Sequence, residues 1–562
     1  MKRFFTNQQL LYWIFVVVLM IPNIGMFYTE STGLLTRIVA VLLPLGCYMA
    51  AFTLKRRPGI MFWWLFLLVF IGAFQTFLLF LYGESPIAVD MYLNVVTTNV
   101  TEASELLANL LGGLLFVIGV YGGSIALAIV SQRSSSVLDE AFRRRWRRVG
   151  LCLVAAGVVL LGVNYAVDKR FRLLNDVFPV NGVYNMVLAV ERFSDGIARA
   201  DDWQTFDAQA RTSRADTVPE VYVLVIGETA RADNFALYGY ERPTTPRLSA
   251  LGDSVITFTD ALTMSNTTHK SVPLLLSAAG CQGSMDSLYT QRGLIDAFRE
   301  AGYATAYYSN QRRNHSFIDR LGCEAAEVRF LKDSLLLANV YDEELLPLID
   351  NRLSRYDGGK LLIVLHTYGS HFKYHDRYPE SMTHFTPENP VSAELPMRDE
   401  LINGYDNTVR YADYIVGEVI ARLDSLNVPA VVAYTSDHGE DIYDDERGRF
   451  LHASPLPTYW QTRVPLVMWA SAEYRNVYPL VWTALLGNAR RPVSTNMVLY
   501  HTLLDMAGIT TRLLRPELSL AGLRYSAPER LYVTDHNEFV PLHEAGFKAV
   551  DMEDFRRAGI SF

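Results

Sequence analysis

Five long apolar stretches in the first third of the chain constrain its fold more than any other feature. A helix needs roughly 20 mostly apolar residues to cross the hydrocarbon core of a bilayer. The stretches occupy residues 10–28, 34–52, 60–81, 106–130 and 149–167. No small-residue cleavage site follows the first stretch, and four more spans do, so we interpret it as a retained span and not as a signal peptide. The sequence therefore predicts an N-terminal bundle of five transmembrane helices over residues 1–167.

Basic residues are concentrated in three of the segments that flank these stretches. Lys2 and Arg3 precede the first, residues 55–57 separate the second from the third, and a run of arginines within residues 133–148 separates the fourth from the fifth. These segments share one side of the membrane, and the positive-inside rule makes it the cytoplasm. Because five is an odd number, the polar two thirds of the chain is predicted to be extracytoplasmic.

The loop between the third and fourth stretches, residues 82–105, falls on the same outer side. It carries Asn94, Thr98 and Glu102 at a spacing of four residues, which puts them on one face of a helix. Two interpretations stay open from the residues alone. The face is either ordinary solvated surface or a polar patch at the membrane that holds a lipid headgroup.

The pattern changes after the spans, where short β-branched runs alternate with helical stretches. The runs lie at 221–226, 304–308, 361–365, 430–435, 464–469 and 531–534. Apolar strands that alternate with helices indicate a mainly parallel sheet with helices on both faces. We therefore predict an α/β catalytic domain over residues 219–562, joined to the spans by a linker with surface helices over residues 168–218. Ligands of such sheets bind beyond the carboxyl ends of the strands.

Charge and cysteine content narrow the possible functions. The formal net charge of −8 argues against a general nucleic-acid binder, which usually has a basic face. Four cysteines are too few for a disulfide scaffold. Cys281 and Cys323 are in the polar part and could pair there, but the sequence does not supply the geometry that a disulfide needs.

Acidic and histidine side chains follow three of the predicted strands. They are Glu228 after the first, His366 and His371 after the third, and Asp437, His438 and, a little later, His452 after the fourth. Each segment alone is equally consistent with a capped turn or a surface polar pair. Carboxylates and imidazoles that converge without cysteine favour a catalytic Zn²⁺, or Mn²⁺, over a structural zinc.

Two threonines, Thr267 and Thr268, precede an apolar helical stretch that contains Pro273 in its first turns. The N-terminus of a helix favours an anion such as an alkoxide or a phosphate. A hydroxyl becomes a good nucleophile when a metal or a base lowers its pKa. The pair is therefore either a candidate nucleophile or simply the cap of the helix.

Together these segments match a known family. The chain resembles the phosphoethanolamine transferases of the alkaline-phosphatase superfamily, which include lipid A modifying and mobile colistin-resistance enzymes. The matching blocks are 227–240 (GETARADNFALYGY), 271–273 (SVP), 365–371 (LHTYGSH), 405–407 (YDN), 437–440 (DHGE) and 451–452 (LH). The resemblance covers nearly the whole chain and implies five spans followed by a sulfatase/alkaline-phosphatase-like catalytic domain.

The resemblance also implies roles for individual residues. The metal ligands of the family fall on Glu228, Asp437 and His438. Thr268, five residues before Pro273, falls on the nucleophile, which is also a metal ligand.

Further positions match residues that handle the substrate. His371 and His452 correspond to residues that bind substrate phosphate or a second metal. Asn94, Thr98 and Glu102 correspond to the polar loop near the lipid headgroup, which favours the functional interpretation of that loop.

The function implied is transfer of phosphoethanolamine from phosphatidylethanolamine to lipid A or a related envelope glycan, through a phospho-threonine-type intermediate. The enzyme would be a multi-pass protein of the bacterial inner membrane with its catalytic domain in the periplasm. Its partners would be the donor lipid, the glycan acceptor and membrane lipids. Nucleic acid is not expected among its partners. On lipid A, the added amine would reduce negative surface charge and weaken the binding of cationic peptides such as polymyxin.

Several alternatives stay open. The segment around Thr268 lacks the cysteines common in the lipid A branch, which leaves other acceptors possible. A phosphodiesterase or a phosphoglycerol transferase of the same superfamily would use the same residues, and a non-catalytic membrane sensor would retain them without turnover. A sulfatase would need a Cys/Ser-x-Pro-x-Arg segment at its nucleophile, and the segment around Thr268 does not have this pattern.

Overall fold

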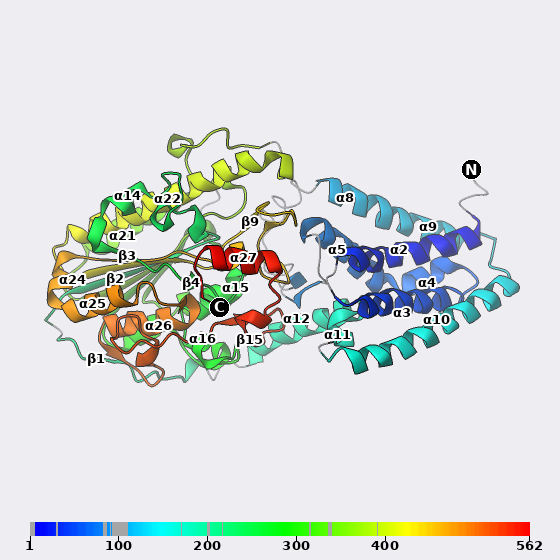
Figure 1. Ribbon diagram of the computed structural model, residues 1–562, viewed down its shortest axis with the longest axis horizontal. Helices are drawn as coiled ribbons and strands as arrows, with labels where there is room; N and C mark the ends of the chain where they lie inside the picture. The colour runs from blue at the N-terminus through cyan, green and yellow to red at the C-terminus, as the bar shows by residue number, and fades with distance from the viewer. Residues whose placement is uncertain are drawn as a thin grey trace. The chain divides into compact units, whose positions relative to one another are not determined.

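The computed structural model describes residues 6–29, 32–82, 87–89, 91–92, 111–169, 171–198, 203–215, 217–313, 316–334, 340–390 and 392–561. The chain divides into two compact units, Met1–Ser194 and Asp195–Phe562. The first unit is helical, and the second is built around a central sheet (Figure 1). The division between them falls inside the segment that the sequence identifies as a linker.

The first unit contains the apolar helices. They are α2 Gln8–Thr29, α3 Leu34–Phe52, α4 Pro58–Trp64, α5 Phe66–Tyr82, α8 Leu111–Val117, α9 Gly123–Arg133 and α10 Glu140–Val167. A π-helical turn, Ile118–Gly122, joins α8 to α9. Among the described residues four helices are long and apolar enough to cross a membrane, or five if a bent pair counts as one span.

The bent pair corrects one expectation. The third apolar stretch is not a single helix over residues 60–81, because α4 and α5 meet at an angle of 74°. The break falls at Leu65, which follows the last residue of α4. Neither proline nor glycine occurs at this position, so hydropathy alone could not reveal the break.

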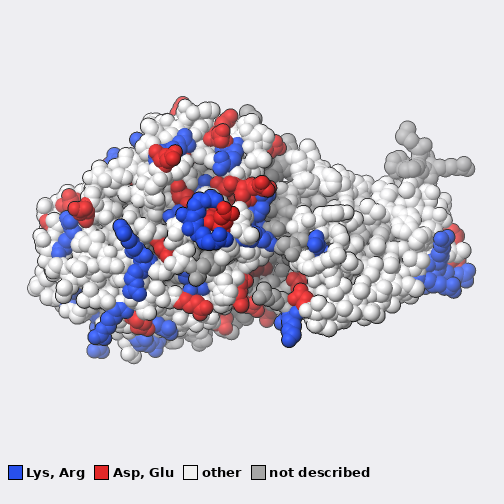
Figure 2. All heavy atoms as spheres, in the orientation of Figure 1, with Lys and Arg blue, Asp and Glu red and all other residues white. Residues whose placement is uncertain are grey.

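Helices α3 and α10 cross closely at two glycines. A Cβ atom on Gly46 would lie 2.8 Å from the carbonyl oxygen of Gly150, and one on Gly150 would lie 2.8 Å from the nitrogen of Ala50. Small residues at a crossing let two membrane helices approach each other. On the visible face, Lys and Arg side chains of this unit gather where α10 begins, and the flank of the bundle is largely white (Figure 2).

Two further helices follow the bundle, α11 Leu173–Asp176 and α12 Val180–Ala198. Both helices lie within residues 168–218, the segment for which the sequence predicts a linker with surface helices. The loop residues Asn94, Thr98 and Glu102 lie outside the described residues.

The second unit is organised by a seven-stranded sheet with the order β3-β11-β8-β2-β7-β5-β6. Its strands are β2 Glu220–Gly227, β3 Val255–Thr257, β5 Ala304–Ser309, β6 Glu327–Phe330, β7 Lys360–His366, β8 Ala430–Ser436 and β11 Leu466–Ala470. Strands β8, β2, β7, β5 and β6 are parallel, and β11 is antiparallel to both of its neighbours. The predicted α/β architecture with a mainly parallel sheet is confirmed.

One predicted strand is not part of this sheet. The run at 531–534 forms β14 Leu531–Val533, which pairs antiparallel with β15 Phe539–Pro541 in a separate two-stranded sheet. The polar turn between the two strands returns the chain on itself, so the run forms a hairpin. Edge strands β3 and β6 escaped prediction because they are only three and four residues long and partly exposed.

Three other pairs of short strands complete the β-structure: β1 Arg211–Thr212 with β13 Ile509–Thr510, β4 Ala261–Leu262 with β12 Val493–Ser494, and β9 Asp441–Ile442 with β10 Phe450–Leu451. The α-helices are α14 Pro246–Ala250, α15 Thr268–Leu275, α16 Ala279–Gln282, α17 Ser287–Thr290, α18 Leu294–Glu300, α19 Phe317–Gly322, α20 Leu331–Ser334, α21 Leu346–Ser354, α22 Arg398–Asp424, α23 Tyr459–Thr462, α24 Ala472–Val477, α25 Pro479–Asn488, α26 Thr495–Met506 and α27 Ala549–Arg557.

Helices cover both faces of the central sheet (Figure 1). Every residue of β2 is buried. Tyr222, Leu224 and Ile226 pack into one large apolar cluster with residues of α15, α18 and α26, and alternate residues of a strand point to the opposite face. Burial of each large apolar side chain contributes about 1.5–3 kcal/mol. This burial holds the carboxyl ends of β2, β7 and β8 in register at one edge.

Candidate active site

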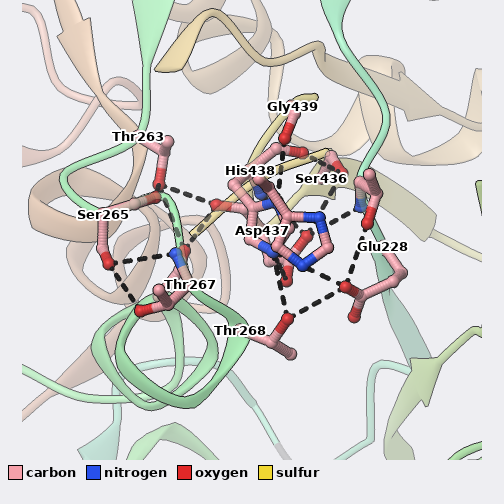
Figure 3. A network of polar contacts seen from close by, with 12 residues as sticks. Glu228, Thr263, Ser265, Thr267, Thr268, Ser436, Asp437, His438 and Gly439 are labelled. Carbon is pink, nitrogen blue, oxygen red and sulfur yellow. Dashed lines mark hydrogen bonds and ion pairs between the residues drawn. The ribbon is translucent and has the colours of Figure 1, made fainter. Parts of the chain in front are cut away.

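Four side chains converge at the carboxyl edge of the sheet (Figure 3). Glu228 follows β2, Asp437 and His438 follow β8, and Thr268 is the first residue of α15. The hydroxyl Oγ1 of Thr268 lies 2.9 Å from Oε1 of Glu228 and 3.0 Å from Nε2 of His438. The structure thus brings these two strand ends and the start of α15 together.

The tautomer of His438 follows from its second nitrogen. Nδ1 lies 2.9 Å from the carbonyl oxygen of Gly439. A carbonyl only accepts hydrogen bonds, so Nδ1 carries the proton and the lone pair of Nε2 faces Thr268. Burial lowers the pKa of His438 to about 4. The ring is therefore neutral at pH 7, the state in which an imidazole binds metal.

The donor set fits a zinc ion. Oδ2 of Asp437 is buried without a hydrogen-bond partner and lies 3.2 Å from Nε2 of His438. The Oε1 atom of Glu228 lies 3.6 Å from the same nitrogen. Metal–ligand bonds of about 2.0–2.2 Å in a tetrahedron put neighbouring ligand atoms roughly 3.3 Å apart. The observed spacings match, and a metal would give the orphaned oxygen of Asp437 its partner.

The other oxygen of Asp437 is already occupied. Oδ1 accepts hydrogen bonds from the backbone N–H groups of Thr229, at 3.0 Å, and His438, at 2.7 Å. The carbonyl oxygen of Asp437 accepts from Thr263 at 2.7 Å and from Ser271 at 2.6 Å. These bonds fix the carboxylate and direct Oδ2 to the centre of the site.

Contacts of a buried arginine hold the loop after β2 in place. Arg231 forms an ion pair with Asp444 at 2.7 Å, and its guanidinium stacks over the ring of Trp460. The hydroxyl of Tyr405 accepts from the N–H of Arg231 and donates to the carbonyl of Thr229. The blocks at 227–240 and 405–407 thus contact each other, which explains their residue types in structural terms.

His452 is held beside the first cluster by a carboxyl group. Nδ1 of His452 lies 2.8 Å from Oε2 of Glu440, and the hydroxyl of Tyr374 donates to Oε1 of the same group. The ring centroids of His438 and His452 are 4.3 Å apart. Burial raises the pKa of Glu440 to about 8 and lowers that of His452 to about 4, so a single proton is shared across this contact.

A second grouping of possible ligands includes His452. One ligand atom each from Glu228, His438 and His452 lies within 4.8 Å of the others. An ion held by Glu228, Asp437 and His438 would therefore lie within reach of His452. A group bound to that ion would lie within its reach as well.

His371 lies next to His452. Its ring centroid is 5.8 Å from that of His452, and it stacks on Tyr368 at 5.1 Å. Burial and the cation of Arg377 hold the pKa of His371 well below its usual value. The Nζ of Lys332 lies over the ring of Tyr368, so the surroundings of His371 carry positive charge.

His366 does not join the cluster. Its Nδ1 lies 3.2 Å from the hydroxyl of Tyr307, and burial lowers the pKa of its ring to about 4. His366 is the last residue of β7, so its side chain points to the face of the sheet on which Tyr307 packs.

The pairing of Cys281 with Cys323, which the sequence leaves open, is not formed. Cys281 and Cys323 are both free thiols. The Sγ atom of Cys281 instead lies 3.2 Å from Nε2 of His501.

Two polar neighbours of the site carry no clear sequence signal. Gln311 donates from Nε2 to Oε2 of Glu228 at 3.3 Å, and Tyr374 donates to Glu440, the last residue of the block 437–440. Gln311 stands in an irregular segment and Tyr374 begins a short 3-10 helix, Tyr374–Arg377. Only the fold reveals that both lie close to the site.

Comparison with known proteins identifies the class. The sequence profile of the sulfatase family matches residues 220–509. The chain therefore belongs to the sulfatase family.

Individual relatives narrow this class. "Phosphoethanolamine transferase EptA" of Escherichia coli (strain K12) is 32% identical over 299 residues, which cover 52% of this chain and 53% of the relative. "Kdo(2)-lipid A phosphoethanolamine 7''-transferase" of the same strain is 29% identical over 297 residues, or 51% and 50% of the two chains. The chain thus spans about half the length of the curated relatives that it matches.

Solved structures extend the likeness. The integral membrane lipooligosaccharide phosphoethanolamine transferase A of Neisseria meningitidis aligns with a TM-score of 0.75 and 22% identity, covering 91% of this chain and 98% of that one. This match shows that the fold of both units is shared. The C-terminal periplasmic domain of EcEptC from Escherichia coli, solved in complex with Zn, aligns with a TM-score of 0.54 and 26% identity, covering 60% and 96%.

Proposed function

We propose that the chain is a membrane-bound phosphoethanolamine transferase that moves phosphoethanolamine from phosphatidylethanolamine to lipid A or a related envelope glycan. The observation that carries the proposal is the position of the Thr268 hydroxyl, within 3.0 Å of both Glu228 and His438. The names of the most similar relatives supply the transferred group and the acceptor class.

We assign the metal-binding role to Glu228, Asp437 and His438, with Thr268 as the fourth ligand. Zn²⁺ suits this set of oxygen and imidazole ligands, and Mn²⁺ is the alternative. When bound, the ion supplies a Lewis acid that lowers the pKa of a ligated hydroxyl and polarises a phosphoryl oxygen.

In the first step Thr268 is the nucleophile. Its Oγ1 attacks the phosphorus of phosphatidylethanolamine, and the hydroxyl proton passes to Oε1 of Glu228, which accepts its hydrogen bond. The bond between phosphorus and the glycerol oxygen breaks, and that oxygen takes up the proton from Glu228 as diacylglycerol leaves. Phosphoethanolamine remains esterified to Thr268. Diacylglycerol stays in the bilayer, which explains why such a reaction suits an enzyme with membrane spans.

In the second step an acceptor oxygen attacks the same phosphorus. The new bond joins the phosphorus to the acceptor, and the bond to Oγ1 of Thr268 breaks. The acceptor proton returns to the threonine. We assign His371 and His452 to orient the phosphate or to exchange protons in this step, because both rings are neutral and lie along one wall of the site.

The proposed location is the bacterial inner membrane, with the catalytic unit in the periplasm. The distribution of basic residues supports this orientation. On lipid A the transferred amine would reduce surface negative charge and weaken the binding of polymyxin.

The test is a mass spectrum of the peptide that contains Thr268, recorded after the purified full-length protein meets phosphatidylethanolamine without acceptor. We expect a phosphoethanolamine adduct on Thr268 and release of diacylglycerol. The Thr268→Ala protein is the control, and it should show neither while keeping its fold.

Other outcomes would point elsewhere. Diacylglycerol release with free phosphoethanolamine and no adduct would favour a phosphodiesterase. Full transfer by a folded Thr268→Ala protein would overturn the nucleophile. Unchanged lipid A masses in cells that express the active enzyme would remove lipid A as the acceptor.

A further inference from the structure

A pocket with a few polar side chains in a largely apolar lining lies at one end of the helix bundle of the first unit. It is formed by the last turns of α2, the first turns of α3 and the segment that follows α10. Its cavity volume is about 40 Å³. Its lining includes Asn23, Phe27, Thr36, Arg37, Asp176 and Phe178.

Two buried polar atoms of the lining lack hydrogen-bond partners. They are Nε of Arg37 and Oδ1 of Asn23. Asn23 is only 2% exposed. Buried polar groups in proteins are almost always satisfied, so an orphaned donor and an orphaned acceptor in one pocket indicate a bound group that supplies both partners.

One nitrogen of each side chain is already engaged. The Nδ2 of Asn23 donates to the carbonyl oxygens of Ala40, at 2.8 Å, and Phe178, at 2.7 Å. These bonds fix the amide, so its Oδ1 cannot turn away. The Nη1 of Arg37 donates to the carbonyl oxygen of Phe27 at 3.3 Å, which holds the guanidinium at the end of α2.

The two unpartnered atoms need ligand groups of opposite kinds, one an acceptor and the other a donor. The N–H of Arg37 needs an acceptor, and an anionic oxygen suits a guanidinium best. The Oδ1 of Asn23 needs a donor. The carboxylate of Asp176 lines the same pocket, accepts a bond from the N–H of Arg172 at 2.6 Å, and favours a donor with positive charge. The complementary ligand thus carries a phosphate-like anion and an N–H cation a short distance apart.

The position of the pocket in the bundle restricts the source of this ligand. The pocket lies where α2 ends at Thr29 and α3 begins at Leu34. Apolar spans leave the hydrocarbon at such ends, and phospholipid headgroups occupy this depth.

We propose that this pocket binds the headgroup of a zwitterionic phospholipid, with the phosphate on Arg37 and a primary ammonium between Asn23 and Asp176. Neither Thr268 nor the metal-binding set takes part, so lipid binding here is independent of the proposed transfer reaction. The site predicts a preference among lipids. Phosphatidylglycerol lacks the cation, and phosphatidylcholine has the cation but no N–H to donate.

The experiment is native mass spectrometry of the full-length protein in detergent with phosphatidylethanolamine, phosphatidylglycerol and phosphatidylcholine at equal concentrations. Wild type should retain phosphatidylethanolamine most strongly. Arg37→Gln should weaken its binding roughly tenfold, as expected for loss of a charge-assisted hydrogen bond. Asp176→Asn keeps an oxygen for the N–H of Arg172, and it should remove the preference over phosphatidylglycerol.

The matched control is Arg57→Gln. Arg57 also donates from Nη1 to a backbone carbonyl, that of Gln132, at 3.1 Å, but it does not line the pocket. Lipid binding should be unchanged in Arg57→Gln.

Three results would overturn the site: equal retention of the three lipids by wild type, the same loss in Arg57→Gln as in Arg37→Gln, or an unchanged preference in Asp176→Asn. If Arg37→Gln does not fold, Asp176→Asn still decides the outcome. Undiminished binding of phosphatidylethanolamine by a folded Arg37→Gln protein would place the lipid elsewhere.

Discussion

Gly369 packs directly against the backbone of Glu228. A Cβ atom on Gly369 would lie 2.7 Å from the carbonyl oxygen of Glu228 and 2.8 Å from its nitrogen. Gly369 also has φ +50°, in the left-handed region that side chains disfavour. The segment after β7 therefore sets the position of the carboxylate that follows β2.

Gly369→Ala should displace Glu228 and weaken the metal site. The left-handed backbone alone costs about 1 kcal/mol, and the contact forces a shift of the Glu228 backbone. Misplacement of a catalytic group by about 1 Å costs up to roughly a hundredfold in rate. We expect zinc affinity, measured by competition with a chromophoric chelator, to fall about tenfold or more, together with transferase activity.

Gly358→Ala is the matched control. Gly358 has φ +81°, but a Cβ atom there would meet nothing within 4 Å. It should lose a similar amount of stability and keep its zinc affinity. Equal zinc affinities in the two variants would show that Gly369 does not position Glu228.

Much of the fold could be predicted because its signals are local. The length of the apolar stretches predicted the helices of the first unit. The β-branched runs predicted the five central strands of the sheet. The 74° break at Leu65 has no local signal, because it depends on how α4 and α5 pack against other helices. The same limit applies to the run at 531–534, whose β-branched residues fit a hairpin as well as a central strand.

The site was predictable where its residues follow strands. Glu228, Asp437 and His438 stand at strand ends, and a parallel sheet brings such ends to one edge. The contact of Tyr374 with Glu440 joins segments 66 positions apart. No periodicity encodes that contact, so only the folded chain reveals it.

Tyr374→Phe should reduce activity and leave the metal set in place. It removes the hydroxyl that donates to Oε1 of the buried Glu440. An unsatisfied buried carboxyl oxygen costs about 1–3 kcal/mol, and Glu440 then orients His452 less firmly. Loss of such a supporting bond typically costs about 10–100-fold in activity or metal affinity. We expect kcat to fall in this range, with zinc content near that of wild type.

The control for this change is Tyr356→Phe. Its hydroxyl donates to the carbonyl oxygen of Gly359, before β7 and far along the strand from the site. Turnover should be unaffected by this substitution. A Tyr374→Phe enzyme with wild-type kcat would mean that Glu440 holds His452 without the tyrosine.

Removal of metal should lower the thermal stability of the second unit. Without an ion, Oδ2 of Asp437 is a buried oxygen with no hydrogen-bond partner. A ligand present at a hundred times its Kd stabilises a protein by about 2.7 kcal/mol. We expect chelation to lower Tm by several degrees and zinc to restore it.

Asp437→Asn tests whether this shift comes from the proposed site. The amide keeps an oxygen for the N–H groups of Thr229 and His438 but lacks the negative charge that zinc prefers. Its Tm should respond little to chelator or zinc. A chelator shift as large as that of wild type would place the ion elsewhere.

The stability of the second unit should also depend on pH through Glu324. This carboxyl accepts from the N–H groups of Gly293, at 2.8 Å, and Asp296, at 3.2 Å, at the start of α18. Burial raises its pKa from 4.5 to about 8. Between these values the folded state binds a proton that the unfolded state has lost. Stability therefore falls as pH rises through this window, by up to about 1.4 kcal/mol per pH unit.

Glu324→Gln removes the titration and should flatten this dependence. Thermal unfolding of the full-length protein at pH 5, 6.5 and 8 would measure it, the wild type losing stability relative to the variant as pH rises. Glu300→Gln is the control, because Glu300 also accepts two backbone N–H groups, those of Ala208 and Ala210, but is exposed. Its pH profile should parallel that of wild type. A Glu324→Gln profile that also parallels wild type would show that Glu324 is ionised in the fold, stabilised by the two N–H groups against the effect of burial.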